Sequence, residues 1–530
     1  MCDTGKFNRF LKWNVYQIYP RSFMDSNGDG IGDIKGITSK LDYLKELGIN
    51  AVWLCPCYKS PNCDNGYDIS DYRDIMDEFG TLEDWKEMIA AMHERGIKLI
   101  MDFVGNHTSS EHKWFKQART SRDNKYHDYY IWRDKIPNDW QSVFGGSAWE
   151  YNKATNEYYL HSFAVGQPDL NWENEKVRKE MSDIIDYWVD SGVDGFRCDV
   201  LDYIAKDFKK GLMNNGPKLH EYIKALFGRE KVKHVFTVGE CSMGEDKIKD
   251  ICGEDRDELK CIFQFDHFDI GKTRDKFERA DRNLDRLRAT LVKWQYFAEK
   301  NDLLYTLFAD NHDNAHYITR AGDTQKRYES ATMLAAMFFL LKGIPFIYQG
   351  TEIGTPDPHY DDIGDFDDVE TFNYYNARKN EIPHGKLMEM INFGSRDNAR
   401  RPMCWDNTKN YGFSTADKTW TPLHSRGAEV NLENDRKSKK SVFRFYKKLL
   451  ELRNKSDAIK FGKFEDITQG NGYFAYIRVH GDEKILVVCN FDAPREIVGL
   501  PDGKYLFGNR GSERKTSGNY AAFETAVFVI

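Results

Sequence analysis

Short runs of consecutive apolar residues recur over the first two thirds of the chain, and the segments between them repeat apolar positions every three or four residues. The runs predict strands buried on both faces, and the helical period predicts amphipathic helices that cover them. We expect strands at residues 15–19, 51–54, 99–104, 195–200, 235–238, 262–265, 303–308 and 344–348. One predicted helix face is marked by Leu82, Trp85, Met88, Ile89 and Met92. Eight strand-then-helix units predict an α/β fold, a closed parallel (β/α)8 TIM barrel.

Two regions depart from this alternation. Residues 105–171 are rich in Trp, Tyr, Asn and Gly and lack a clear crossover helix, which predicts a subdomain inserted after the third strand. From about residue 461 onward, short alternating strands with Gly and Pro turns predict a separate antiparallel β domain. We therefore expect a barrel formed by residues 1–104 and 172–458, an inserted subdomain over 105–171, and a C-terminal β-sandwich over 459–530.

The composition argues against several classes of protein. The chain has no run of eighteen apolar residues and no apolar stretch near its start, so we expect neither a membrane span nor a secretory leader. Its 76 basic and 84 acidic side chains are scattered and give a net charge of −8, which argues against nucleic acid as a partner. Ten cysteines without a disulfide framework predict reduced thiols and a cytoplasmic protein, and a monomer is the default expectation.

Three carboxylates follow predicted strands at the edge where the carboxyl ends of a barrel's strands meet. They are Asp199, Glu240 and Asp313. Ionisable groups at the ends of apolar strands are costly unless they share one solvated site, so we expect these three to converge. Arg197 lies two residues before Asp199, so on a strand both side chains face the same way and the guanidinium holds the carboxylate ionised.

A converging pair of carboxyl groups has a well-defined chemical use. Hydrolysis of a glycosidic bond needs one group to protonate the leaving oxygen and another to attack or to activate water. Aromatic residues make up 14% of the chain and offer flat apolar faces for stacking against sugar rings. The alternative is that the carboxylates form ion pairs at the barrel rim without chemistry.

The motifs around these residues resemble those of a known family. Segments 102–107, 195–199, 239–240 and 311–313 resemble the four motif regions of the α-amylase superfamily, glycoside hydrolase family 13. Segments 66–72, 167–172 and 396–400 are similar to the oligo-1,6-glucosidase and α-glucosidase branch of that family. The resemblance covers nearly the whole chain.

The resemblance implies a role for each matched residue. Asp199 corresponds to the nucleophile, Glu240 to the acid/base, and Asp313 to the carboxylate that holds the sugar and stabilises the transition state. The residues that correspond to sugar contacts and pocket walls are Asp64, Tyr67, His107, Phe144, Phe163, Gln167, Arg197, His312 and Arg400. Within this set Tyr67 is the aromatic platform, and Asp64 and Arg400 grip the non-reducing end, although Arg396 is an alternative to Arg400. The family's retaining mechanism implies carboxyl groups about 5 Å apart.

The resemblance also implies a substrate class. A closed pocket makes an exo-acting enzyme that releases one glucose at a time from short chains. Val200 follows the nucleophile, and Val at this place resembles α-1,6 specialists, whereas the simpler explanation is strand packing. An α-1,4-glucosidase, a trehalose-6-phosphate hydrolase, a sucrose isomerase and a catalytically inactive sugar-binding protein remain alternatives.

One further pattern predicts a metal. Asp25, Asn27, Asp29 and Asp33 alternate with glycines, and such hard oxygen ligands on a tightly curled loop suit calcium, with magnesium possible. The resemblance adds the carbonyl of Ile31 as a ligand of a structural ion. The alternative is a loop of Asx turns without metal. The glycines of this loop lack the spacing of a dinucleotide-binding loop, and we expect no organic cofactor.

Overall fold

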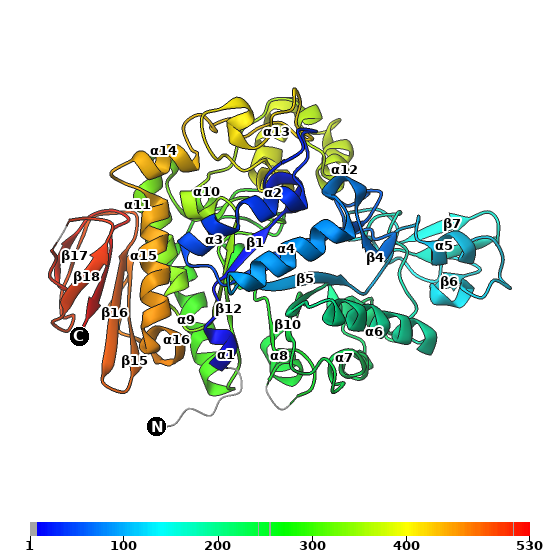
Figure 1. Cartoon of the computed structure of the whole chain (residues 1–530), viewed down its shortest axis with the longest axis horizontal. Coiled ribbons are helices and arrows are strands. Elements are labelled where there is room, and N and C mark those ends of the chain that lie inside the picture. The colour runs from blue at the N-terminus through cyan, green and yellow to red at the C-terminus, as the bar shows by residue number, and fades with distance from the viewer. Residues whose placement is uncertain (1–7, 242, 254–255, 512) are drawn as a thin grey trace.

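The computed structural model describes residues 8–530 apart from 242, 254–255 and 512 (Figure 1). Its largest sheet has eight parallel strands in the order β11-β10-β9-β5-β2-β1-β13-β12. These strands are β1 (Val15–Ile18), β2 (Ala51–Leu54), β5 (Lys98–Val104), β9 (Gly195–Asp199), β10 (Phe236–Gly239), β11 (Cys261–Ile262), β12 (Thr306–Leu307) and β13 (Ile344–Tyr348). All eight predicted strands are therefore present, and the (β/α)8 fold is confirmed.

The barrel closes between β11 and β12, the two ends of the strand order. There the hydroxyl of Thr306 donates a hydrogen bond of 3.2 Å to the carbonyl of Ile262. Each of these strands is paired on one side and spans two residues, shorter than the predicted 262–265 and 303–308. The missing ladder partner explains why the apolar runs extend further than the strands do.

Helices cover the outside of the barrel (Figure 1). Among all helices of the described residues, those of seven or more residues are α3 (Leu41–Leu47), α4 (Leu82–Glu94), α6 (Glu175–Asp190), α7 (Leu219–Phe227), α8 (Glu245–Ile251), α9 (Leu284–Lys300), α11 (Arg327–Phe339), α12 (Val369–Arg378), α13 (His384–Gly394) and α15 (Val442–Lys455). The shorter ones are α1 (Asn8–Leu11), α2 (Ile34–Ser39), α5 (Lys113–Ala118), α10 (Tyr317–Ala321), α14 (Leu432–Lys437) and α16 (Asp457–Phe461).

The predicted apolar face of α4 is the face that packs inward. Trp85, Met88, Ile89 and Met92 are buried, and Trp85 meets Trp188 of α6 edge to face at 4.8 Å. The helix begins after Thr81, whose side chain and that of Asp84 form a reciprocal capping box. The sequence therefore specifies both where this helix starts and which side of it joins the core.

The segment after β5 leaves the barrel and returns at α6. It contains α5 and an antiparallel sheet of β6 (Trp132–Arg133), β8 (Glu157–Leu160) and β7 (Trp149–Asn152), in that order. The hairpin-like pair β3 (Tyr58–Lys59) and β4 (Asp71–Ile75) precedes it in the chain. Figure 1 shows this segment, in cyan, projecting from one end of the molecule. The exact domain boundaries stay a prediction.

The C-terminal region forms a second layer of antiparallel strands. Five strands follow the order β14-β15-β16-β20-β18, and β17 pairs with β19 beside them. Their bounds are β14 (Lys463–Asp466), β15 (Tyr473–His480), β16 (Glu483–Asn490), β17 (Arg495–Ile497), β18 (Lys504–Gly508), β19 (Gly518–Tyr520) and β20 (Thr525–Val529). Tyr476 of β15 donates a hydrogen bond to Ala336 of α11, which ties this sheet to the barrel. In the described residues no helix is long and apolar enough to span a bilayer.

Candidate active site

Arg197 lies at the centre of the site, on β9 in the barrel interior. Its Nη1 is 2.6 Å from Asp102 Oδ1 and 2.7 Å from Asp199 Oδ1, and its Nη2 pairs with Glu240. Arg197 is 2% exposed, so these contacts form out of water, where charge-assisted hydrogen bonds are strong. One guanidinium therefore contacts both the predicted nucleophile and the predicted acid/base, and its contact with Asp199 is the one that their spacing on the strand predicts.

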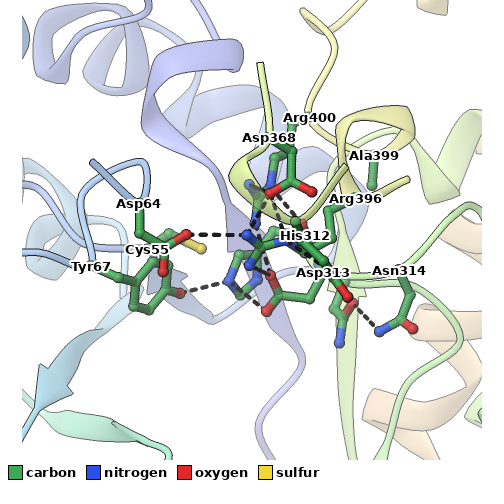
Figure 2. A network of polar contacts seen from close by, with 12 residues as sticks. Cys55, Asp64, Tyr67, His312, Asp313, Asn314, Asp368, Arg396, Ala399 and Arg400 are labelled. Carbon is green, nitrogen blue, oxygen red and sulfur yellow. Dashed lines mark hydrogen bonds and ion pairs between the residues drawn. The ribbon is translucent and has the colours of Figure 1, made fainter. Parts of the chain in front are cut away.

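Tyr67 and His312 form the next part of the site (Figure 2). The Tyr67 hydroxyl lies 2.7 Å from His312 Nε2, and the two rings are parallel within 8°. His312 Nδ1 is 2.8 Å from the side chain of Gln17 on β1, and its Nε2 is 3.0 Å from Asp313. This network fixes the orientation of both rings beside the carboxylates.

Asp313 is surrounded by cations. Its Oδ1 is 2.8 Å from Arg400 Nη2 and 3.3 Å from Arg396 Nη1. The expected ion pair between Asp64 and Arg400 is not what the structure shows, because Asp64 pairs with Arg396 at 3.1 Å (Figure 2). Arg400 is held instead by Asp313 and by the carbonyl of His312, to which its Nε donates at 2.9 Å. The alternative partner Arg396 is thus the one that the fold selects.

The inserted segment supplies one wall of the site. The Gln167 amide contacts Asp64 Oδ2 at 3.2 Å and His107 Nε2 at 3.1 Å, which joins this wall to the barrel. Phe163 packs against His107 with ring centroids 5.3 Å apart, and Phe144 meets Phe163 at 5.8 Å. The predicted wall residues therefore lie together and make contact with the barrel residues of the site.

Val200 is not part of a strand, contrary to the prediction. β9 ends at Asp199, and Val200 adopts φ 34° and ψ 46°, ahead of the 3-10 helix η4 (Leu201–Ile204). This left-handed conformation is unfavourable for a β-branched residue, so strand packing does not explain the side chain. Val200 packs against the small cluster of Phe144, Phe163 and Ala164. It therefore belongs to the same wall of the site.

The three carboxyl groups differ in their pKa values: two are raised and one is lowered. Burial raises the pKa of both Asp199 and Glu240, against the opposing charge of Arg197. Burial alone would also raise the pKa of Asp313, but His312, Arg400 and Arg396 lower it well below the ordinary range. The charge of Glu240 also raises the pKa of Asp199, and the charge of Asp313 raises that of Glu240, so both groups bind a proton more readily than an ordinary carboxyl group does, whereas Asp313 favours its ionised form.

The carboxylates of the acidic loop at residues 25–33 accept hydrogen bonds from backbone amides in and next to the loop. Asp25 accepts the amides of Asn27, Gly28 and Gly30, and Asp33 accepts those of Ser26 and Gly36. Asp29 accepts the amide of Ile31. Within the described part of the chain, no three His, Cys, Asp or Glu side chains are gathered in a way that would hold a metal ion. The arrangement is that of Asx turns, although the oxygen donors have the hardness that calcium requires.

Comparison with known proteins decides the family. The alpha-amylase family model, described as "Alpha amylase, catalytic domain", matches residues 17–462. The chain belongs to the alpha-amylase family. It is therefore a glycoside hydrolase, as the converging carboxylates and the motif resemblance predict.

Members of the alpha-amylase family with several activities are similar to this chain. An oligo-1,6-glucosidase of Parageobacillus thermoglucosidasius is 47% identical over 92% of this chain and 91% of its own. A trehalose-6-phosphate hydrolase of Bacillus subtilis is 40% identical over 92% of this chain and 90% of its own. The crystal structure of a trehalose-6-phosphate hydrolase of Bacillus licheniformis, 38% identical, superposes with a TM-score of 0.93 over 98% of this chain and 99% of that one.

Two buried carboxylates of this alpha-amylase family site carry no role in the sequence prediction. Asp102 accepts hydrogen bonds from Arg197 and, at 2.8 Å, from the Trp53 indole. Asp368 accepts from Arg396 Nε at 2.9 Å and lies 3.6 Å from Arg400. Asp102 stands in a matched motif and could have been assigned from it, whereas the sequence around Asp368 carries no signal that links it to a distant arginine.

Proposed function

We propose that this enzyme is a retaining, exo-acting α-glucosidase of the oligo-1,6-glucosidase type. It would cleave α-1,6-glucosidic bonds at the non-reducing end of short isomalto-oligosaccharides. The observation that carries the proposal is the single guanidinium of Arg197, which holds both Asp199 and Glu240. Two carboxyl groups on one guanidinium are close enough to act on one anomeric carbon, as a retaining mechanism requires.

The first step forms a covalent bond to the enzyme. Asp199 attacks the anomeric carbon while Glu240 donates its proton to the leaving glycosidic oxygen, so that the aglycone departs neutral. The raised pKa of Glu240 supplies that proton near neutral pH. In the second step Glu240, now ionised, takes a proton from a water molecule as that water attacks the anomeric carbon, and the bond from that carbon to Asp199 breaks, with net retention.

The remaining residues bind and orient the sugar. Asp313 stays ionised and faces the positive charge that develops on the ring in the transition state. Tyr67 would support the ring from below, and His107 and His312 would bind its hydroxyl groups. The Asp64–Arg396 pair would close the end of the pocket at the non-reducing sugar. This closure supports release of one glucose at a time.

The linkage preference rests on two supports. The relatives named oligo-1,6-glucosidase include those of Parageobacillus thermoglucosidasius and Bacillus cereus, at 47% and 45% identity. The second support is Val200, a bulky wall residue directly after the proposed nucleophile. Glucose release from isomaltose, maltose, sucrose and trehalose-6-phosphate tests the proposal. We expect isomaltose to be the preferred substrate, and preference for maltose or for trehalose-6-phosphate would overturn it.

We also propose that the enzyme acts as a cytoplasmic monomer and binds a structural calcium ion, or magnesium in its place. The cytoplasmic assignment is supported by the nine described cysteines, each of which is a free thiol. The proposed ion would sit at Asp25, Asn27, Asp29, Ile31 and Asp33 and would stabilise the loop without touching the reaction. No organic cofactor enters the proposed chemistry, because Asp199, Glu240 and one water molecule account for every bond and proton transfer.

A further inference from the structure

Gln17 of β1 contacts the active site from inside the barrel and takes no part in the chemistry proposed above. It is 1% exposed, and its amide nitrogen Nε2 lies 2.8 Å from His312 Nδ1 and 3.3 Å from Cys55 Sγ. Burial raises the pKa of the Cys55 thiol well above its usual range, so the sulfur is a neutral, weak acceptor. The two contacts match the two N–H bonds of the Gln17 amide nitrogen.

Aromatic neighbours hold the ring of His312 in its plane. Tyr67 is parallel to this ring within 8°, with centroids 5.3 Å apart, and Tyr19 lies at 6.1 Å and 23°. Trp53 meets the same ring edge to face at 5.8 Å. A ring packed in this way keeps each nitrogen facing the same group, so those groups decide which nitrogen carries the proton.

The other nitrogen of His312, Nε2, faces groups that require a donor (Figure 2). It lies 3.0 Å from Asp313 Oδ2 and 2.7 Å from the Tyr67 hydroxyl. Asp313 is ionised, since neighbouring cations lower the pKa of its carboxyl group despite burial, and a carboxylate oxygen only accepts. The Tyr67 hydroxyl donates its own proton to Asp102 Oδ2 at 3.4 Å, so its oxygen is able to accept from His312.

One protonation state of the His312 imidazole satisfies all of these contacts. With its proton on Nε2, the ring donates towards Asp313 and Tyr67 and accepts from Gln17 at Nδ1. A proton on Nδ1 would face the N–H of Gln17 and would leave the lone pair of Nε2 against the Asp313 carboxylate. A doubly protonated ring would also direct its Nδ1–H at the N–H of Gln17.

We propose that Gln17 is a positioning residue that fixes the proton of His312 on Nε2. It acts through His312, since the chain of donors runs from Gln17 to His312 and from His312 to Asp313. The N–H of His312 is thereby aimed at the carboxylate that faces the positive charge of the transition state. This inference rests on the proposed function, because it assigns a positioning group to the same catalytic site.

Long-range ¹H–¹⁵N correlation spectra of the full chain, labelled with ¹⁵N-histidine, test the proposal without any substrate. Protonated and unprotonated ring nitrogens give different signals, and those of His312 are the signals lost in His312→Gln. Near neutral pH we expect the pattern of a neutral imidazole whose proton is on Nε2. A proton on Nδ1, or on both nitrogens, would overturn the proposal, whichever glucoside the enzyme hydrolyses.

The pH dependence of bond cleavage tests whether the position of this proton matters. In Glu240→Gln, cleavage of p-nitrophenyl α-glucoside needs no proton from the acid/base, so the burst rate should not fall at high pH. Adding Gln17→Glu should create a fall of about tenfold as pH rises, because the ionised carboxylate only accepts and draws the proton from Nε2 to Nδ1. Adding Gln17→Met should instead lower the rate about tenfold at every pH, because methionine offers no donor and does not titrate.

Gln295→Glu in the same Glu240→Gln background is the matched control. Gln295 is also 1% exposed, and its amide binds the backbone of Lys342 outside the active site. Its pH profile should show no basic limb. A Gln17→Glu profile without a new limb, or an equal limb in Gln295→Glu, would overturn the role of Gln17. If the parent chain cleaves no α-glucoside, the proposed function fails, whereas the spectra still decide where the proton lies.

Discussion

Asp64 and Arg396 form an ion pair of 3.1 Å although 332 positions separate them in the sequence. Arg396 also donates to Asp368 and lies over the ring of Phe144 at 4.8 Å. It therefore joins the barrel residue at the end of the pocket to the wall from the inserted segment.

Replacement of Arg396 by lysine should weaken substrate binding. Lysine keeps the positive charge but lacks the planar guanidinium group that binds Asp64 and Asp368 at the same time. We expect KM for isomaltose to rise roughly tenfold, which corresponds to one lost charged hydrogen bond, with a smaller change in kcat. Arg378→Lys is the control, because Arg378 lies over Tyr374 and contacts Asp275 outside the site. An unchanged KM in Arg396→Lys would contradict the assignment.

Asp199 and Glu240 should respond differently to the loss of their charge. Asp199→Asn should lower turnover of every substrate by a factor of about 10⁴ or more, because no bond to the enzyme can form. Glu240→Gln should abolish isomaltose hydrolysis but spare bond cleavage in p-nitrophenyl α-glucoside, whose leaving group needs no proton. A burst of p-nitrophenol in rapid-mixing experiments measures that step. Retained isomaltose turnover in either variant, with an unchanged Tm, would refute the roles.

Val200→Ala should raise the ratio of α-1,4 to α-1,6 activity. The smaller side chain leaves more space beside Phe144 and Phe163, where we expect the leaving group to bind. Parallel kcat/KM values for maltose and isomaltose measure the ratio. Val498→Ala, a change at a 60% exposed residue of the C-terminal region, provides a control with the same loss of volume. If the two variants give the same ratio, Val200 does not select the linkage.

The pH profile should show a basic limb that belongs to Glu240. Burial raises the pKa of Glu240, and its protonated form is required, so kcat/KM falls as pH rises through that raised value. We expect the limb to lie above the ordinary glutamate pKa of about 4.3. The acid limb belongs to Asp199, which attacks as a carboxylate and whose pKa burial raises well above the ordinary value, so kcat/KM also falls as pH falls through that pKa. Asp313 adds no acid limb, because its pKa is well below the ordinary range. With p-nitrophenyl α-glucoside as substrate, the pH profile of Glu240→Gln should lack the basic limb. If the limb persists in this variant, it belongs to a group other than Glu240.

Removal of divalent ions should lower Tm without stopping catalysis. An ion present at about a hundred times its Kd stabilises the folded chain by roughly 2.7 kcal/mol, which a chelator removes. Asp29→Ala should abolish the difference in Tm between calcium and chelator, because Asp29 is exposed and has few other contacts. An identical Tm with calcium and with chelator in the parent chain would favour the loop of Asx turns without metal.

The sequence predicts much of this molecule because its strongest signals are local. Apolar runs and the helix face from Trp85 to Met92 depend on nearby residues alone, and the spacing of Arg197 and Asp199 follows from strand geometry. The pairing of Asp64 with Arg396, where Arg400 was expected, depends on how loops hundreds of residues apart pack together. The left-handed backbone of Val200 likewise reflects the surrounding structure, because valine by itself favours a strand.

The closure of the barrel also affects the chemistry that takes place above it. Glu240 follows β10 on one side of the β11–β12 junction, and Asp313 follows β12 on the other, where a threonine hydroxyl joins the two strands. The sugar ring flattens as its bond breaks, so the groups around it must adjust their separation. At this junction they can do so without rupturing a backbone ladder. The edge at which the barrel closes thus lies between the strand that precedes the acid/base and the strand that precedes the carboxylate facing the ring.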